Sequence, residues 1–466
     1  MMRGTTVPDV LAFSNVTLID GRGGDPVVGA TVVVKDGLFS DVYPGPADLP
    51  ADVKKVDGTG KYLLPGFMNG NVHLLDGIMM MGIGGVEYLA RYEGSFPRVM
   101  QESTQLSLRN GVTTVFSTWD ATEPILEARD QINRGEAVGA RIFAAGNIVG
   151  MNGPFSPDFN FGARQSISPT FADRLDALFA AGVGGALTMM SEADARSALR
   201  DYIARGVDMV KIAVSDHLVQ TIGRTSYLTF PQKWLYWMAE ETHAAGLPLL
   251  SHTTSLQSLE LAYEMGADVM IHPTWTNNLV IPDELIEKIA ADRVGVGVQP
   301  MTDDYSGRLL SKGNWWGLLN SPQHVQNEKK FIEAGANLMI ATDAGCTSHD
   351  VLADLGEDLH ADRPWTIGED HFTWIKALRQ RGLSPMAAIQ SLTHNVAEAY
   401  NKLDLYGTIE TGKVADAVLL DADPLADSEN LRSIVDVYKD GRRVDRDNLP
   451  THALVTAPTG SPIPAL

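Results

Sequence analysis

The chain has 466 residues and a formal net charge of -21, with 44% hydrophobic and 20% charged residues. That length suits a large barrel plus a smaller module, and the acidic balance argues against nucleic acid or anionic membranes as partners. The single cysteine, Cys346, excludes an intramolecular disulfide. Residues 1–20 lack a basic segment followed by an apolar one, and no apolar stretch is long enough to span a bilayer. We therefore expect a cytoplasmic protein.

Short strands and turns recur near the two ends of the chain. Four apolar segments there are predicted strands: Val16–Ile19, Ala30–Val34, Ala417–Leu420 and Val435–Lys439. Turns that contain glycine follow the second and the fourth, at Lys35-Asp36-Gly37 and Asp440-Gly441. We predict one small β-sandwich domain formed from both termini, with residues 1–66 and 398–466.

The middle of the chain alternates apolar runs with helical patterns. The runs are Phe67–Leu74, Val112–Trp119, Ala140–Gly146, Met209–Val214, Leu247–His252, Val269–His272, Val294–Pro300 and Asn337–Asp343. Amphipathic stretches such as Phe230–Ala245 and Leu256–Gly266 separate several of them. This alternation is typical of the α/β class and predicts a (β/α)8 TIM-like barrel over residues 67–397. The segment from Gly150 to about Glu192 is rich in Gly, Pro and Met, and we predict a long loop after the third strand there.

Polar side chains that bind metals stand at the ends of several runs. The candidates are Asn71, His73, Lys211, His252, His272 and Asp343. Because the carboxyl ends of barrel strands converge on one mouth, these side chains are expected to share a pocket. Imidazole and carboxylate suit divalent zinc, cobalt or manganese. Lys211 lies in an apolar run where a buried charge is costly, and a carboxylated lysine that binds the metal removes that cost.

Several motifs resemble those of the amidohydrolase superfamily. They are Leu63–Phe67 before Asn-x-His, Gly111–Val115, Ala341–Gly345, and Gly407–Ala417 with Asp423-Pro424-Leu425. The resemblance implies a mononuclear or binuclear metal hydrolase whose ligands map onto His73, Lys211, His252, His272 and Asp343. It also implies that Asp343 is a catalytic proton shuttle as well as a ligand, and that the protein forms a symmetric homo-oligomer.

One position departs from the superfamily pattern. Asn71 replaces the first histidine of His-x-His, and its amide oxygen is a weaker ligand for these metals than imidazole. We expect one metal per chain, with a loosely bound second metal as the alternative. Asn-x-His resembles a small branch that includes phenylurea hydrolases and molinate hydrolase. That branch implies attack of metal-bound hydroxide on the carbonyl C–N or C–S bond of a neutral urea, carbamate, thiocarbamate or anilide.

Apolar side chains after the strand ends are expected to line a pocket for a small apolar substrate. They are Met79, Met151, Phe155, Trp275 and Trp316. His349, in the loop after Asp343, is either a substrate contact or an ordinary loop residue. Two other functions stay open: a dipeptidase or N-acyl amino acid amidohydrolase, and a non-enzymatic scaffold with a vestigial metal site. The loss of one histidine favours the scaffold, and the five retained ligands oppose it.

Overall fold

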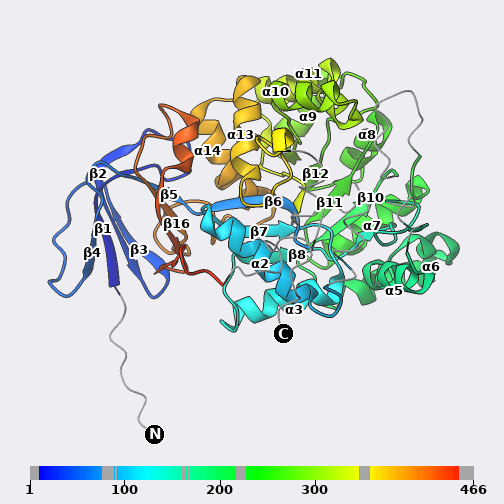
Figure 1. Cartoon of the computed structure of the whole chain (residues 1–466), viewed down its shortest axis with the longest axis horizontal. Coiled ribbons are helices and arrows are strands. Elements are labelled where there is room, and N and C mark those ends of the chain that lie inside the picture. The colour runs from blue at the N-terminus through cyan, green and yellow to red at the C-terminus, as the bar shows by residue number, and fades with distance from the viewer. Residues whose placement is uncertain are drawn as a thin grey trace, which may run out of the picture.

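The computed structural model describes residues 10–75, 92–159, 167–216, 227–345 and 357–450, together with Leu89, Arg164 and Gln165. A β-rich module lies at one side of a larger module in which helices surround a set of strands (Figure 1). No helix among the described residues has the length and apolarity needed to cross a membrane.

The β-rich module is one eight-stranded sheet built from both ends of the chain. Its strands are β1 (Val10–Leu18), β2 (Val27–Lys35), β3 (Leu38–Tyr43), β4 (Lys54–Asp57), β5 (Tyr62–Pro65), β16 (Ala417–Leu420), β17 (Ile434–Lys439) and β18 (Arg442–Arg443). They follow the order β18-β17-β16-β5-β1-β2-β3, with β4 beside β1. Strand β5 joins the two halves because it pairs in parallel with β1 and antiparallel with β16. Strands from both termini therefore share one sheet. The division into a terminal β-sandwich domain and a barrel domain, with limits at residues 66 and 398, stays a prediction.

Both predicted glycine turns are present in this sheet. Asp36 and Gly37 connect β2 to β3 with φ of 54° and 81°, and Asp440 and Gly441 connect β17 to β18 with φ of 51° and 74°. Two-residue turns of this kind need positive φ at both central positions, which glycine and aspartate tolerate.

The larger module contains parallel strands that follow a ring. They are β6 (Phe67–His73), β7 (Val112–Ser117), β8 (Arg141–Ala144), β9 (Ile148–Val149), β10 (Val210–Ala213), β11 (Leu249–His252), β12 (Val269–Ile271), β13 (Gly295–Gly297), β14 (Asn337–Leu338) and β15 (Ala344–Gly345). One sheet has the order β14-β13-β12-β11-β10-β9 and the other β15-β6-β7-β8.

Two short stretches of chain belong to both sheets and close the ring. Residues 337–345 pair with β13 through β14 and with β6 through β15. Residues 141–149 pair with β7 through β8 and with β10 through β9. Between β14 and β15, the backbone N–H of Gly70 donates to the carbonyl of Ile340 at 2.9 Å. The eight predicted runs therefore form the predicted barrel, with strands that are shorter than the runs.

Helices cover the outside of the ring in Figure 1. They are α2 (Phe96–Arg109), α3 (Thr122–Asn133), α5 (Pro169–Ala180), α6 (Glu192–Ile203), α7 (Gln232–Ala244), α8 (Leu256–Glu264), α9 (Asp283–Ala291), α10 (Asp303–Ser311), α11 (Pro322–Glu333), α13 (Asp370–Gln380), α14 (Pro385–Leu392) and α15 (His394–Ala399). Short 3-10 helices are η2 (Gly185–Met189), η3 (Trp315–Asn320), η4 (Glu357–Leu359) and η5 (Ser428–Arg432). Helices α7 and α8 lie within the two amphipathic stretches predicted to be helical.

The long loop predicted from Gly150 to about Glu192 is wrong in part. The segment contains α5 and η2. Helix α5 starts with Pro169 and buries Ala172, Leu175 and Phe179, which lie on one helical face. The Gly, Pro and Met content of the segment concealed this periodicity.

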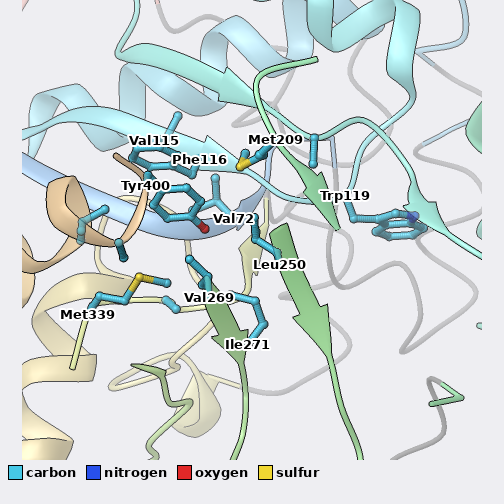
Figure 2. Packing of buried hydrophobic residues seen from close by; sticks show 14 of the residues in the cluster. Val72, Val115, Phe116, Trp119, Met209, Leu250, Val269, Ile271, Met339 and Tyr400 are labelled. Atoms are coloured by element: carbon cyan, nitrogen blue, oxygen red, sulfur yellow. The ribbon is translucent and has the colours of Figure 1, made fainter. Parts of the chain in front are cut away.

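The barrel interior and its floor are apolar. Figure 2 shows Val72, Phe116, Val269 and Ile271 gathered in one cluster with Tyr400, which follows α15. The ring of Tyr400 stacks on Phe116 with centroids 3.9 Å apart. This packed core fixes the strand ends that carry the polar side chains.

A buried cation links the barrel to the terminal sheet. Arg141, on β8, lies 2.5 Å from the carboxylate of Asp416 and also pairs with Asp440. Its guanidinium lies over the ring of Tyr406, 4.4 Å from the centroid. The two modules therefore share a charged contact as well as apolar packing.

Candidate metal centre

Strand β6 places Asn71 and His73 beside Asp343. Residues two apart on a strand face the same side, and both side chains reach Asp343 Oδ1: His73 Nε2 lies 2.7 Å from it, and Asn71 Nδ2 donates to it at 2.9 Å. The other ring nitrogen of His73 lies 3.1 Å from the carbonyl oxygen of Trp119. Both ring nitrogens therefore face oxygen acceptors, and both hydrogen bonds require a doubly protonated imidazole. A cation held by Nε2 and Oδ1 would replace one of those protons, so this pair fits a metal ion.

Asp343 has an unusual backbone and a strongly perturbed carboxyl group. Its φ is 58°, in the left-handed region, and its N–H donates to the carbonyl of Asn71 at 2.9 Å. Burial alone would raise the pKa of the Asp343 carboxyl, but His73, Lys211 and His272 together hold this pKa well below its usual value. Side chains from three separate strands thus act on one carboxylate.

Lys211 lies in the middle of β10 and is 1% exposed. Its Nζ donates to Thr118 Oγ1 at 3.0 Å. Burial lowers the pKa of the Lys211 amine to about 8, against the opposing effect of Asp343. Thr118 also donates to Asn71 Oδ1, so this hydroxyl connects Lys211 to strand β6.

His252 and His272 form a second pair at the ends of β11 and β12. Their ring centroids are 4.5 Å apart with the planes at 82°. His252 Nε2 lies 3.3 Å from the carbonyl oxygen of Asp216, and His272 Nδ1 lies 2.9 Å from that of Thr253. Trp275 stacks on His272 with centroids 4.1 Å apart, which fixes the plane of this imidazole.

The six predicted site residues fall into two groups, and their convergence on one metal ion stays a prediction. Asn71, His73 and Asp343 are in direct contact, and Lys211 joins them through Thr118. His252 and His272 contact each other, and His272 contributes to lowering the pKa of the Asp343 carboxyl. Within the residues that the structure describes, no three His, Cys, Asp or Glu side chains are grouped closely enough to hold a metal ion. The ligand set therefore stays a prediction.

The end of strand β7 supplies contacts that the sequence interpretation missed. Asp120 accepts hydrogen bonds from Ser117 Oγ at 2.5 Å and from the backbone N–H groups of Leu74 and Leu75 at 2.8 Å each. Burial raises the pKa of the Asp120 carboxyl. The signal was the three polar residues Ser117, Thr118 and Asp120 at the end of the second apolar run.

Asp370, at the start of α13, connects β6 to the segment between β14 and β15. Its Oδ2 accepts from Asn69 Nδ2 at 2.8 Å and from Thr342 Oγ1 at 2.6 Å, and its Oδ1 accepts from the N–H of Gly368 at 2.8 Å. Asn69 Oδ1 in turn accepts from the N–H of Asn71 at 3.2 Å. Asp370 therefore supports the backbone next to both Asn71 and Asp343. Sequence spacing offered no signal for it.

The predicted pocket residues have different surroundings. Met151 and Phe155 are buried in the main core, and Trp275 contacts His272. Trp316 packs on a separate cluster, with its ring centroid 5.6 Å from that of Trp365. Met79 and His349 lie outside the described residues. A large cavity of about 1330 Å³ is lined by Asp36, Asp440 and residues of α2 and α3, and none of the predicted site residues lines it.

The chain matches known proteins over nearly its full length. The model of the amidohydrolase family matches residues 62–444. The structure is similar to that of molinate hydrolase, with 45% identity over 98% of this chain and 99% of that chain and a TM-score of 0.94. It is also similar to phenylurea hydrolase B, with 49% identity over 96% of this chain and 99% of that chain and a TM-score of 0.93. A Xaa-Pro dipeptidase, 19% identical over 93% of this chain and 99% of that chain with a TM-score of 0.73, shares the fold. With the strand-end site and these matches together, the chain belongs to the amidohydrolase family.

Proposed function

We propose that this chain is a metal-dependent hydrolase that cleaves the carbonyl C–N or C–S bond of a neutral urea, carbamate, thiocarbamate or anilide. The observation that carries the proposal is the likeness to molinate hydrolase and phenylurea hydrolase B, at 45% and 49% identity over nearly the whole chain. The contact between Asn71 and the Asp343 carboxylate supports it, because Asn-x-His is the feature that separates this branch by sequence.

The residues proposed to hold the metal are His73, His252, His272, Asp343 and a carboxylated Lys211. Zinc, cobalt or manganese suits this donor set, and such an ion polarises a carbonyl and lowers the pKa of water to about 7. Carboxylation of Lys211 is supported by its burial, because a carbamate would exchange a buried ammonium for a ligand of the metal. Asn71 is a weak ligand whose amide is already engaged with Asp343 and Thr118, so we propose one metal per chain.

Asp343 is proposed to move the proton. Its carboxylate would accept a proton from the attacking water and deliver it to the leaving amine or thiol. The hydrogen bond from Asn71 Nδ2 holds Oδ1, which fixes the orientation of the carboxylate for this transfer.

A neutral substrate is favoured over a dipeptide or an N-acyl amino acid. A free carboxylate calls for an arginine clamp. Of two arginines that could form one, Arg164 is already paired with Asp173 and Asp176, and Arg224 lies outside the described residues. The indole of Trp275 stacks on His272, and Trp275 belongs to the same apolar cluster as Trp365. These suit an apolar ring or alkyl group.

The test is chelation followed by reconstitution with zinc, cobalt or manganese, assayed on phenylureas, thiocarbamates, dipeptides and N-acyl amino acids. We expect activity on the first two classes to disappear with the metal and return with it. Full turnover by metal-free protein would contradict the proposal, and activity restricted to peptides would favour the dipeptidase. Well under one metal per chain in freshly purified protein, with no turnover, would favour the non-enzymatic scaffold. The homo-oligomer and the cytoplasmic location stay predictions.

A further inference from the structure

Thr118 connects strand β10 to strand β6 through its hydroxyl group. The residue follows β7 and is fully buried, and its N–H donates to the carbonyl of Val72 at 3.1 Å. Its Oγ1 accepts a hydrogen bond from Lys211 Nζ at 3.0 Å and donates one to Asn71 Oδ1. Because Val72 directly follows Asn71, the backbone contact holds this hydroxyl beside the Asn71 amide.

The hydrogen bonds at Thr118 have a defined direction. The Lys211 ammonium carries only donors, so the Thr118 hydroxyl accepts from it and keeps its single hydrogen to donate. The atom of Asn71 that faces this hydroxyl must therefore be the amide oxygen, and the amide nitrogen donates to Asp343 Oδ1 at 2.9 Å. A carbamate on Lys211 would still carry one N–H on Nζ, so the direction does not depend on carboxylation.

The opposite orientation of the Asn71 amide is unfavourable at both ends. It would place Oδ1 against the Asp343 carboxylate, where two acceptors face each other, and Nδ2 against the Thr118 hydroxyl, whose hydrogen would lose its acceptor. The backbone of Asn71 is held separately: its N–H donates to Asn69 Oδ1 at 3.2 Å, and its carbonyl accepts from the N–H of Asp343 at 2.9 Å. The side-chain contacts therefore decide which end of the amide faces Asp343.

We propose that Thr118 is a positioning residue that fixes the orientation of the Asn71 amide. In this orientation Asn71 turns N–H groups, which cannot bind a cation, toward Asp343, and its oxygen stays with Thr118. Asn71 then holds the Asp343 carboxylate in place and stays outside the set of metal ligands, unlike the role predicted from the sequence. The inference rests on the proposed function, because it concerns the proton transfer proposed for Asp343.

The test compares Thr118→Val, which keeps the shape of the side chain, with Thr118→Ser, which keeps the hydroxyl. With an arylurea as substrate, we expect Thr118→Val to lower kcat about tenfold and to leave KM within about twofold, and Thr118→Ser to keep most of kcat. In an Asn71→Ala background, Thr118→Val should change kcat little, because the side chain through which it acts is gone. Elemental analysis should find the same metal content per chain in all variants.

Urea unfolding of the chelated, metal-free protein tests the same hydrogen bonds without turnover. Thr118→Val removes a hydrogen bond from Lys211 and another from Asn71, whereas in the Asn71→Ala background it removes only the bond from Lys211. We therefore expect Thr118→Val to shift the unfolding midpoint less in the Asn71→Ala background than in wild type. Equal shifts would show that Thr118 does not hold the amide.

Thr113→Val is the matched control. Thr113 lies near the start of the same strand, β7, is 1% exposed, and donates from its hydroxyl to the carbonyl of Phe67 at 3.4 Å. We expect this variant to lower the unfolding midpoint and to leave kcat unchanged.

Three results would overturn the role of Thr118. They are wild-type kcat in Thr118→Val, a loss in Thr118→Ser as large as in Thr118→Val, and a loss that persists in the Asn71→Ala background or accompanies loss of metal, which would assign the effect to Lys211. Wild-type protein that hydrolyses no urea, carbamate, thiocarbamate or anilide would contradict the proposed function. The unfolding comparison would then still decide whether Thr118 orients the amide.

Discussion

Removal of the Asp370 carboxylate should weaken both the fold and the metal site. Asp370→Ala leaves three buried donors without an acceptor: one N–H of Asn69, the hydroxyl of Thr342 and the N–H of Gly368. Each unsatisfied buried donor costs about 1–3 kcal/mol, and because Asn69 and Thr342 also bond each other, we expect a total of about 4 kcal/mol. That is a large part of a typical stability of about 5–15 kcal/mol.

Asp370→Asn should cost about half as much as Asp370→Ala. In either orientation, the amide oxygen of the new asparagine accepts the hydrogen bonds of one Asp370 oxygen. Its NH2 group then faces the donors that bonded the other oxygen, and those hydrogen bonds are lost. Because Asn69 holds the N–H of Asn71, both variants should also weaken metal affinity by roughly tenfold, the lower end of the usual effect of losing a supporting hydrogen bond. Urea unfolding followed by circular dichroism measures the first effect, and competition with a chelating dye measures the second.

Asp283→Asn and Asp283→Ala provide the control. Asp283 also begins a helix, α9, but its side chain is 83% exposed and pairs with Lys330 on the surface. These variants share any effect of the helix dipole and should cost at most about 1 kcal/mol. The supporting role of Asp370 would be refuted if the Asp370 and Asp283 variants lost the same free energy of unfolding, or if Asp370→Ala bound the metal as tightly as wild type.

Three further outcomes are expected. Burial raises the pKa of Tyr202 to about 12 from 10.0, so the fold favours the neutral phenol; this stabilisation is present below pH 10 and is lost as the pH rises toward 12. Tyr202→Phe should therefore flatten the fall of unfolding free energy between pH 10 and 12, while an identical slope would exclude Tyr202 as its source. Asn71→His should raise metal content toward two per chain in elemental analysis, and an unchanged content would show that the amide does not limit the second site. Asp343→Asn should keep the wild-type circular dichroism spectrum and lose at least about a hundredfold in turnover; near-normal turnover would remove Asp343 from proton transfer.

The apolar runs located the barrel strands well and their ends less well. The run Phe67–Leu74 corresponds to β6, but Val294–Pro300 corresponds to a strand of only Gly295–Gly297. Hydrophobicity continues past the last strand-paired residue because Val298 stays buried after the strand has ended. Burial and strand pairing are separate properties, and the sequence pattern reports the first.

The candidate site was predictable where one side chain carried the chemistry. His73, Asp343 and Lys211 stood out because such groups are rare in apolar runs. Thr118 did not stand out, because threonine is common in strands, and Asp370 did not because its partners are far away in the sequence. Supporting hydrogen bonds join residues that lie far apart in the chain. The spacing of residues in one sequence therefore does not reveal them.

The order of strands in the terminal sheet has a consequence for biosynthesis. Strand β5 receives one neighbour, β1, early in translation and the other, β16, only when the barrel between them has been made. Until then one edge of β5 has no paired strand, and Arg141 lacks its two ion-pair partners, Asp416 and Asp440. The nascent chain must therefore keep its first strands from aggregating through most of its synthesis. A truncated product that ends before β16 should depend on chaperones and be degraded quickly.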